Sequence, residues 1–530
     1  MIIKIIFSVC LTVIMLPAFS NEYNVLDYGA KGDGTTIETQ AIQKAVDACS
    51  KTGGSVIFPG GKYLSGTIYF KNNVTLHLQK GAVILGSTKM TDYPENLPKY
   101  TFYRLGKIKR ALIYAENCKN IGISGEGTID GQGNKIYKAN GEKVKSYGER
   151  PHVIWMIQSK HIKISGIKLQ NSSLWMQHYL ACDNLYIHNI EVYNHCNKNN
   201  DMIDINGCKD VVISDCRGDT DDDGITIKST HPKSNENILI TNCVISSHCN
   251  AIKCGTESNT GFKNIVISNC IIRPSQKREV IYGKPDGISG ISLEVVDGAK
   301  MNGVSISNMV IDGPQVPLFI RLGNRARGYD KDLPKPQVGS IENITISNIT
   351  AFNADITGSS ITGIPGHTIK NITLDNIRIF YKGGGTLEDA NRLIPENESG
   401  YPEASMFNNL SVYGLFVRHA ENITLKNVEF HLQNNDKRPA LHLQNIENAR
   451  IINLQAKVDA NTTLIYGKDI KDIFIQNPHP ENQCASSIDI HGKQSESVRL
   501  TDVYTKYFKT IYKTLDGANK KVVILGNMFK

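Results

Sequence analysis

Beyond its first twenty residues, the 530-residue chain has no hydrophobic run long enough to cross a membrane. A membrane-spanning helix needs about 20 consecutive apolar residues. The chain also lacks the amphipathic helices of leucine-rich, ankyrin and tetratricopeptide repeats, and it carries no nucleic-acid-binding motif. We therefore expect no stable membrane insertion, no helical solenoid and no nucleic-acid partner.

Cysteine is present, but in a pattern that suits neither a metal centre nor a closed disulfide framework. Of twelve cysteines, Cys10 lies in the N-terminal segment, which leaves eleven, an odd number for a fully paired exported chain. The spacing of Cys249 and Cys254 is too loose for a zinc site. Four cysteines recur at similar positions of a repeat and are interpreted as small buried residues: Cys182, Cys208, Cys243 and Cys270. We expect no metal and no cofactor.

Residues 1–20 have the pattern of a secretory signal peptide. Lys4 gives a positive start, Ile5–Leu16 an apolar core, and Ala18 with Ser20 a small-residue cleavage site. This pattern predicts export to the periplasm or the extracellular space. The formal charge of +8 favours an acidic partner such as a uronic-acid polymer, or reflects only a solvated surface.

A unit of the form Asn-Ile/Val-x-Ile-x-Asn-x-x-Ile recurs along most of the chain, with shortest steps of about 23 to 28 residues. Its alternating β-branched residues predict strands with one buried face, and each unit is too short to bury that face alone. The units begin at Asn120, His161, Asn184, Asp210, Asn237, Asn264, Gly303, Asn343, Asn371, Asn422 and Asn448. Stacking them predicts an all-β fold, a single-stranded right-handed parallel β-helix.

Two polar clusters stand where strands of this solenoid begin. Asn-Asn-Asp at 199–201 and Asp-Asp-Asp at 221–223 each precede an alternating apolar segment. Aligning the units places Asp201, Asp223 and Asn250 at equivalent positions of successive coils. Neighbouring carboxylates cannot all ionise freely, so at least one pKa should be raised, as acid–base hydrolysis of a glycosidic bond requires. A calcium loop or a solvated turn is the alternative.

The chain resembles a known group of β-helix proteins. The segment from Tyr23 to Ile68 is similar to the opening of the pectate-lyase-like superfamily, and Gln40, Ile42, Ala45 and Val46 within it suit a cap helix near residues 37–50. The sequences IDGQG at 129–133 and NSSLW at 171–175, together with the two polar clusters, resemble glycoside hydrolase family 28, the polygalacturonase family. The resemblance extends to about Asn448.

This resemblance implies a secreted glycoside hydrolase that cleaves a pectic, galacturonate-containing polysaccharide or oligosaccharide by inverting acid/base hydrolysis. By position, Asp222 would be the general acid, and Asp201 and Asp223 would hold and deprotonate the attacking water. The family histidine falls on Asn250, so that His248 either replaces it or is structural.

A second departure concerns substrate charge. The cationic motif that grips a galacturonate carboxylate in the family falls on Ser292-Leu293-Glu294, where a glutamate would repel that group. Arg321 and Arg325 could supply a replacement pair, or form surface salt bridges. The remaining substrate-binding candidates are Asn199, Lys228, Lys253, Arg150, His178 and Trp175, the last either stacked on a sugar ring or only packed in the fold.

We divide the chain into a signal peptide (1–20), an N-terminal cap with the first coils (21–110), the β-helix that carries the candidate site (111–495) and a C-terminal cap or tail (496–530). A polysaccharide lyase of the same superfamily and a non-catalytic glycan-binding β-helix are the alternative functions. Loops at 91–109 and 383–404 could close one end of a cleft. The sequence leaves exo or endo action and the oligomeric state open.

Overall fold

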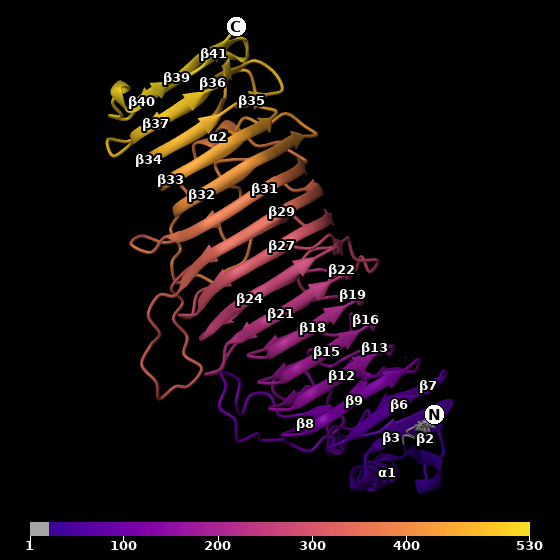
Figure 1. Cartoon of the computed structure of the whole chain (residues 1–530). Coiled ribbons are helices and arrows are strands. Elements are labelled where there is room, and N and C mark those ends of the chain that lie inside the picture. Colours follow the sequence, from indigo (N-terminus) through magenta and orange to yellow (C-terminus); the bar gives the residue numbers. More distant parts are fainter. Residues whose placement is uncertain (1–20) are drawn as a thin grey trace, which may run out of the picture.

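The computed structural model describes residues 21–530, so the predicted signal peptide lies outside the described residues. Parallel strands form one 39-stranded sheet that winds along the described chain as a solenoid (Figure 1). The predicted right-handed parallel β-helix is confirmed. None of the helices in residues 21–530 is long and apolar enough to cross a membrane.

Each coil in the first two thirds of the stack contributes three strands, which align with their equivalents on the next coil. The first row, the repeat row, contains the recurring sequence units. Its strands are β3 (Gly54–Phe58), β6 (Val74–Leu78), β9 (Lys119–Gly125), β12 (Lys160–Ser165), β15 (Asp183–His188), β18 (Lys209–Ser214), β21 (Asn235–Thr241), β24 (Gly261–Ser268), β27 (Lys300–Asp312), β29 (Ser340–Ala354), β31 (Ile369–Tyr381), β32 (Leu415–Leu432), β33 (Leu441–Ala456), β34 (Thr463–Gln476), β37 (Glu496–Thr501) and β40 (Val523–Leu525).

The second row, the corner row, consists of β4 (Gly61–Ser65), β7 (Ala82–Gly86), β10 (Thr128–Asp130), β13 (Lys168–Gln170), β16 (Glu191–Asn194), β19 (Arg217–Thr220), β22 (Val244–Ser247) and β25 (Ile271–Ile272). The third, the site row, consists of β5 (Ile68–Tyr69), β8 (Ala111–Glu116), β11 (His152–Ile157), β14 (Gln177–Leu180), β17 (Ile203–Asn206), β20 (Ile225–Ser229), β23 (Asn250–Ser258), β26 (Ser289–Val295), β28 (Val316–Leu322) and β30 (Ser359–Thr362). From β27 to β33, a single long strand spans the repeat and corner positions.

The first residue of each repeat unit explains the asparagine in the motif. Asn237 and Asn264 adopt left-handed backbone conformations, with φ of 58° and 55°, which asparagine tolerates better than most residues. The Nδ2 atom of Asn264 donates to Oδ1 of Asn237 at 3.0 Å. The same contact joins Asn371 to Asn343 and Asn448 to Asn422, so the asparagines form ladders along the stack.

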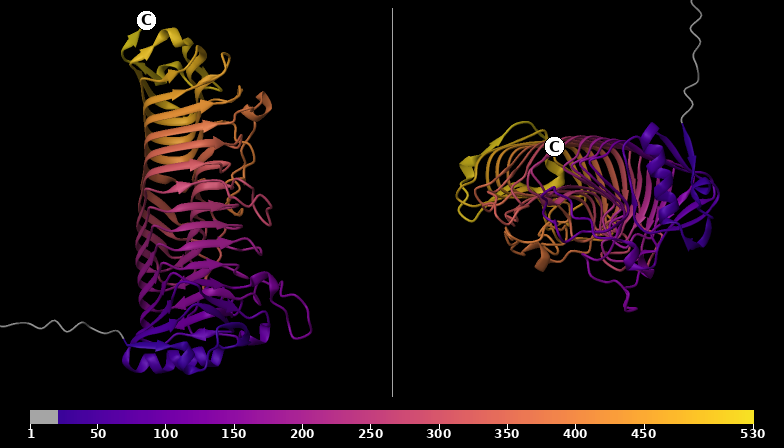
Figure 2. Two further views of the ribbon diagram at one scale, coloured as in Figure 1. Left: turned by 90° about the vertical axis from the view of Figure 1, so that its right-hand side faces the viewer. Right: turned by 90° about the horizontal axis from the view of Figure 1, so that it is seen from below.

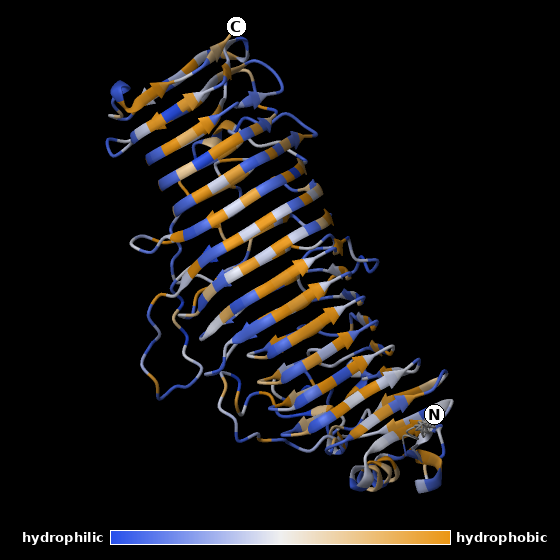
Figure 3. Cartoon of the chain, viewed as in Figure 1, coloured by the Kyte–Doolittle hydropathy of each residue, from blue (hydrophilic) through white to orange (hydrophobic). Residues whose placement is uncertain are grey.

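Isoleucines at alternate positions fill the inside of the solenoid. Ile164, Ile187, Ile213 and Ile240 are completely buried on successive coils, and the alternation of apolar and polar residues is visible along the strands in Figure 3. Burying one such side chain contributes about 1.5–3 kcal/mol. The cysteines that we interpreted as small core residues are buried in the same way.

Both ends of the stack are covered. The predicted cap helix is α1 (Thr39–Thr52), which buries Ile42, Ala45 and Val46, whereas Gln40 is exposed. The other N-terminal elements are η1 (Val25–Tyr28), β1 (Glu22–Asn24) and β2 (Asp33–Ile37). The C-terminal elements are β35 (His479–Pro480), β36 (Cys484–His491), β38 (Val503–Tyr504), η4 (Thr505–Tyr507), β39 (Phe508–Leu515), η5 (Lys520–Val522) and β41 (Met528–Phe529). The strands of the solenoid therefore continue into the segment 496–530, which the sequence assigned to a cap or tail.

Long insertions interrupt the coils between strands. They span residues 87–110, 131–151, 273–288, 323–339 and 382–414 and contain only the short helices η2 (Met90–Asp92), η3 (Gly133–Lys135) and α2 (Leu387–Ala390). In the left view of Figure 2, the long loops project from one side of the stack. The candidate site lies where several of them meet the site row.

Candidate active site

A pocket of about 220 Å³ contains the acids that the sequence singled out. Residues that precede or belong to β17, β20 and β23 form its floor, and four of the five long loops reach its walls. The lining residues are Arg104, Tyr147, Trp175, Asn199, Asp201, Asp222, Asp223, Lys228, Lys253, Thr256, Glu257, Tyr282 and Tyr401. All three predicted catalytic aspartates are among them.

The strand register agrees with the alignment of the repeats. Ile203 pairs with Ile225, and Ile225 pairs with Ile252 on the following coil. Counting back two residues places Asp201, Asp223 and Asn250 at equivalent positions. The alignment deduced from the repeat pattern is therefore confirmed, and it brings the two acid clusters together on adjacent coils.

Asp222 has the surroundings of a proton donor. Burial and the negative charge of Asp223 raise the pKa of Asp222 to about 6, against the opposing charges of Lys253 and Lys228. One carboxyl oxygen accepts from the Asp223 backbone at 2.9 Å, and the other faces Nδ2 of Asn199 at 3.4 Å. A carboxyl group in this environment retains its proton in weakly acidic solution, as a general acid must.

Asp223 is surrounded by donors instead. Asn250 donates to Oδ1 through its backbone nitrogen at 3.2 Å and through Nδ2 at 2.7 Å. The Nζ atom of Lys253 lies 3.2 Å from Oδ2. These contacts are those expected of an ionised carboxylate. Asn250, which stands at the position of the family histidine, thus acts on the site by orienting Asp223.

Asp201 belongs to a buried charged group behind the pocket. Burial and the charges of Asp204 and Asp222 raise the pKa of Asp201 well above its ordinary value. Burial also raises the pKa of Asp204 to about 7, although Lys228 opposes it. The Nζ atom of Lys228 lies 3.6 Å from Asp201 and 3.2 Å from Asp204. Oδ1 of Asp201 is buried and has no hydrogen-bond partner within residues 21–530.

A second ionic group forms the far wall. Arg104 pairs with Glu257 at 2.6 Å, and Lys228 lies 3.9 Å from the same carboxylate. Although burial acts in the opposite direction, these cations lower the pKa of Glu257 far below its ordinary value. Lys228 also lies 4.7 Å from the centre of the Trp175 ring, and Arg104 lies 5.3 Å from it. Trp175 therefore faces cations as well as the space in which a sugar would bind.

Arg150 does not line the pocket but holds one of its walls. It donates to the backbone carbonyl oxygens of Ser173 and Lys198 and, at 2.8 Å, to Oδ1 of Asn199. Asn199 in turn faces Asp222. Arg150 is therefore placed to orient the pocket residue Asn199 without lining the pocket itself.

Two predicted histidines are fully buried outside the pocket. His178 packs against the rings of His152 and Trp155, and burial lowers its pKa well below the ordinary value. Nδ1 of His248 lies 2.9 Å from Oδ1 of Asp221, and its Nε2 lies 2.7 Å from the carbonyl oxygen of Lys277. The structure therefore places neither histidine where it could touch a bound sugar.

The repulsion expected from Glu294 needs a charged side chain in the pocket, and that condition is not met. Glu294 is completely buried and does not line the pocket. Burial raises its pKa to about 8 against the opposing charge of Lys253, and within residues 21–530 neither carboxyl oxygen has a hydrogen-bond partner. The group is thus largely uncharged at neutral pH.

Arg321 and Arg325, which we considered as a replacement cationic pair, anchor loops. The Arg321 guanidinium donates to the carbonyl oxygens of Glu396 and Asn397 at 2.7 and 3.1 Å. Arg325 binds Asp297 through Nε at 3.0 Å. Neither lines the pocket.

Sequence reasoning missed several residues of the pocket: Arg104, Tyr147, Thr256, Glu257, Tyr282 and Tyr401. Four of these come from long loops, whose path the repeat pattern does not predict. Glu257 is different, because it follows Lys253 on β23 by four residues. A closer reading of polar residues at the end of that strand could have found it.

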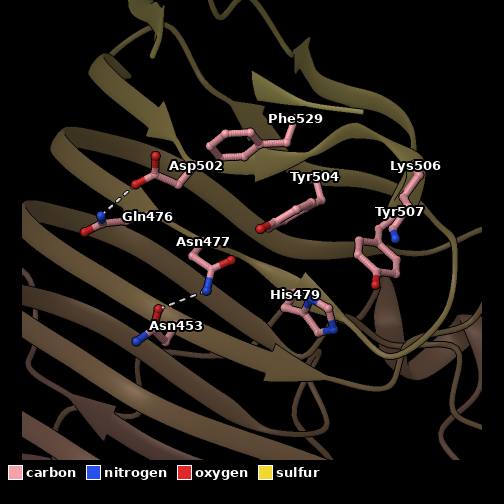
Figure 4. A pocket seen from close by; sticks show the side chains of 9 residues that line it. All are labelled: Asn453, Gln476, Asn477, His479, Asp502, Tyr504, Lys506, Tyr507 and Phe529. Atoms are coloured by element: carbon pink, nitrogen blue, oxygen red, sulfur yellow. Dashed lines mark hydrogen bonds between the residues drawn. The ribbon is translucent and has the colours of Figure 1, made fainter. Parts of the chain in front are cut away.

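A second pocket, of about 470 Å³, lies at the C-terminal end of the stack (Figure 4). Tyr504, Tyr507 and Phe529 form part of its wall. Asp502 is its one acidic lining residue, and its oxygens accept from Gln476 at 2.7 Å and from Asn527 at 3.0 Å. Because acid–base hydrolysis needs a pair of carboxyl groups, this pocket is not the candidate active site.

Comparisons with known proteins agree with this geometry. The family description "Glycosyl hydrolases family 28" matches residues 49–394. A probable polygalacturonase of Vitis vinifera is 27% identical over 377 residues, which cover 67% of this chain and 74% of that protein. An exo-poly-alpha-D-galacturonosidase of Dickeya chrysanthemi is 42% identical over 117 residues, or 21% of this chain and 19% of that one.

Solved structures confirm the fold. A hyperthermoactive exopolygalacturonase from Thermotoga maritima superimposes with a TM-score of 0.59 at 20% identity and covers 78% of this chain and 92% of that one. A polygalacturonase from Erwinia carotovora gives a TM-score of 0.53 at 19% identity and covers 70% of this chain and 95% of that one.

Proposed function

The chain belongs to family 28 of the glycosyl hydrolases, and from this premise we propose that it hydrolyses a pectic, galacturonate-containing polysaccharide or oligosaccharide with inversion at the anomeric carbon. The observation that carries the proposal is the contrast between the raised pKa of Asp222 and the donor-rich setting of Asp223 in one pocket. A carboxyl group that keeps its proton, beside a second carboxylate that can act on water, is what acid–base hydrolysis requires.

In this reaction Asp222 gives its proton to the glycosidic oxygen as the bond breaks. Asp223 accepts a proton from the attacking water, and Asp201, which lines the same pocket, helps to hold that water. The assignment of Asp223 as the general base rests on its contacts with Asn250 and Lys253, which orient the carboxylate, whereas Asp201 lies among other acids.

The cations that would bind a galacturonate carboxylate are not the arginine pair that we considered as a replacement for the family's cationic motif. Arg104 and Lys253 line the pocket, whereas Arg321 and Arg325 do not. An incoming carboxylate can approach the exposed part of the Arg104 guanidinium, and arginine binds carboxylates through two parallel hydrogen bonds. Lys253 lies 5.9 Å from the ring centre of Tyr401, beside the same space.

We further propose action at a chain end or on short oligosaccharides. Arg104 and Tyr401 bring two long loops, 87–110 and 382–414, to the wall of the pocket. Loops on several sides of the acids leave less room for a polymer to pass through than an open groove would. Export, and the division of the chain into cap, β-helix and tail, belong to the same proposal.

Product analysis tests the function directly. Purified protein is incubated with oligogalacturonates, polygalacturonate and rhamnogalacturonan I, and reducing ends, ultraviolet absorbance and the anomer first formed are followed. We expect new reducing ends, no unsaturated product and an inverted anomer. An ultraviolet-absorbing product would identify a lyase instead. Binding without cleavage of any of these glycans would identify a glycan-binding module.

A further inference from the structure

Three side chains from successive coils meet beside the acid cluster. Asn194, Thr220 and Ser247 pair along the corner row, and the next residue on each coil is His195, Asp221 and His248, respectively. Their side chains are buried, with 3% of His195 exposed and none of Asp221 or His248.

The nitrogen and oxygen atoms of this cluster converge. Oδ1 of Asp221 lies 2.9 Å from Nδ1 of His248 and 3.9 Å from Nδ1 of His195. The three candidate ligand atoms all lie within 4.8 Å of one another. In a tetrahedral site with bonds of about 2.0–2.1 Å, ligand atoms stand roughly 3.3 Å apart, a separation that the two measured distances bracket.

Each histidine is oriented by a partner on its outer side. Nε2 of His195 lies 2.8 Å from Oδ1 of Asp219, and Nε2 of His248 lies 2.7 Å from the carbonyl oxygen of Lys277. A hydrogen bond from Nε2–H leaves the lone pair of Nδ1 directed inward, which is how metal-binding histidines are usually held.

One atom of the cluster has no protein partner. Nδ1 of His195 is buried, and no hydrogen bond satisfies it within residues 21–530. An unsatisfied buried polar atom costs about 1–3 kcal/mol. This atom points toward Asp221 and His248, and a cation bound among the three would satisfy it.

We propose that His195, Asp221 and His248 bind one divalent transition-metal ion, with zinc as the best-matched class. Two imidazole nitrogens and one carboxylate oxygen suit zinc and its neighbours, whereas calcium and magnesium prefer oxygen ligands. The absence of a short metal-binding motif is explained by the fold, because the ligands stand one coil apart and the sequence separations are set by the solenoid.

This ion would stabilise the loop at 273–288. Asp221 accepts from the backbone nitrogens of Ile281 at 2.8 Å and Tyr282 at 2.9 Å, and His248 contacts Lys277 of the same loop. Tyr282 lines the active-site pocket. The role assigned to the metal is therefore positional: it fixes the loop and takes no part in bond cleavage.

Metal binding to the full mature protein tests the proposal without reference to activity. The chelator-treated protein is titrated with Zn²⁺, and with Co²⁺ as a spectroscopic probe, and melting temperature is followed in parallel. We expect one ion per chain, a Co²⁺ absorption spectrum typical of mixed nitrogen and oxygen ligands, and a higher melting temperature with Zn²⁺.

Variants locate the ion. His195→Gln and His248→Gln should each weaken Zn²⁺ binding by about 100-fold or more. His188→Gln is the matched control, because His188 lies 3.2 Å from Asp215 on the solvated side of the stack, and it should bind as the wild type does. If the wild type binds no Zn²⁺, or binds it as tightly without His195 and without His248, the cluster is only a hydrogen-bonded ladder and the proposal is wrong. Neither result would bear on the hydrolysis of glycans.

Discussion

Asp221 and Asp222 are consecutive residues that face two different regions, and the difference shows how the fold sets carboxylate chemistry. Asp221 points into the buried corner, where His195 and His248 and two backbone N–H groups surround it and, despite burial, lower its pKa to about 2. Asp222 points into the pocket, where burial and Asp223 raise its pKa to about 6.

The two regions differ in donor supply rather than in burial. In the corner, Asp221 is matched by donors from the next coil and from the 273–288 loop. In the pocket, Asp223 has donors from Asn250 and Lys253, whereas Asp222 accepts from the Asp223 backbone and faces Asn199 at 3.4 Å, so its proton is retained. The donors around Asp221 favour its ionised form, whereas Asp222, with few donors, keeps a proton where a reaction uses it.

The largest expected effect comes from removing the retained proton. Asp222→Asn should lower kcat by about 10²–10⁴-fold, because an amide cannot protonate the glycosidic oxygen. Asp210→Asn is the control, since Asp210 lies outside the pocket and only accepts from Asn237 at 2.8 Å. Activity is measured as reducing ends released. A variant at Asp222 with more than half the wild-type rate would show that the acid has been misassigned.

Lys228→Met tests whether the pocket depends on a buried cation. Lys228 lies within 3.9 Å of Asp201, Asp204 and Glu257, and removing one partner of a buried ion pair costs about 3–5 kcal/mol. The loss should be larger at pH 8 than at pH 4, because Asp201 and Asp204, whose pKa values are raised, are protonated in acid and need less compensation. Denaturant unfolding of the wild type and the variant at both pH values measures this loss of stability.

The matched control for this change is Lys209→Met, since Lys209 is 44% exposed in its side chain and lies 3.9 Å from Glu236. An exposed ion pair contributes about 0–1 kcal/mol. Equal destabilisation by the two substitutions would contradict the view that buried pocket charges depend on each other.

Replacement by asparagine should change the free energy of unfolding in opposite directions at Asp221 and Asp222. The folded pKa of Asp222 is raised, so its ionisation costs stability as pH rises from about 4 to about 6. Asp222→Asn should therefore increase the free energy of unfolding by about 1–3 kcal/mol at pH 7 and change it little at pH 3.

The folded pKa of Asp221 is lowered, so its contribution is present above about pH 4 and is lost as pH falls toward about 2. Asp221→Asn should accordingly destabilise the protein at pH 7 by about 1–3 kcal/mol. Unfolding curves of both variants over pH 3–8 measure the change in the free energy of unfolding that each substitution causes. If both substitutions change it in the same direction at pH 7, the contrast between corner and pocket is wrong.

The sequence predicts the β-helix, the register and the three central acids for a common reason. Stacked coils repeat their pattern, so Asp201 and Asp223 can be aligned without knowing the structure. Arg104, Tyr147 and Tyr401 reach the pocket from irregular loops, where no period constrains the path of the chain. The burial of Glu294 could not be predicted from the repeat pattern either. Alternation shows on which face of a strand a side chain lies, but not how deeply a polar side chain is covered.

The pH dependence of the rate should follow the acid in the pocket. Activity should fall as pH rises through about 6, where Asp222 loses its proton. Lys253 lowers the pKa of Asp222, so Lys253→Met should move this alkaline limb upward by a fraction of a pH unit or more, in addition to lowering the rate through Asp223. Profiles of kcat against pH measure the shift. A limb that moves downward would contradict the assignment.

The smallest expected effect comes from replacing Glu294. If the side chain is neutral, as its surroundings indicate, the substitution should change KM very little. Because its pKa is raised to about 8, the side chain is mostly uncharged at pH 6, and glutamine resembles the neutral acid in size. Glu294→Gln should therefore leave the KM for oligogalacturonate within about threefold of the wild-type value at pH 6. At pH 9, where the carboxylate of the wild type is ionised, the variant should bind the acidic substrate more tightly than the wild type does. Comparison with a neutral oligosaccharide at both pH values separates charge from shape. A large fall in KM for oligogalacturonate at pH 6 would mean that Glu294 is charged and repels the substrate, as the sequence alone suggested.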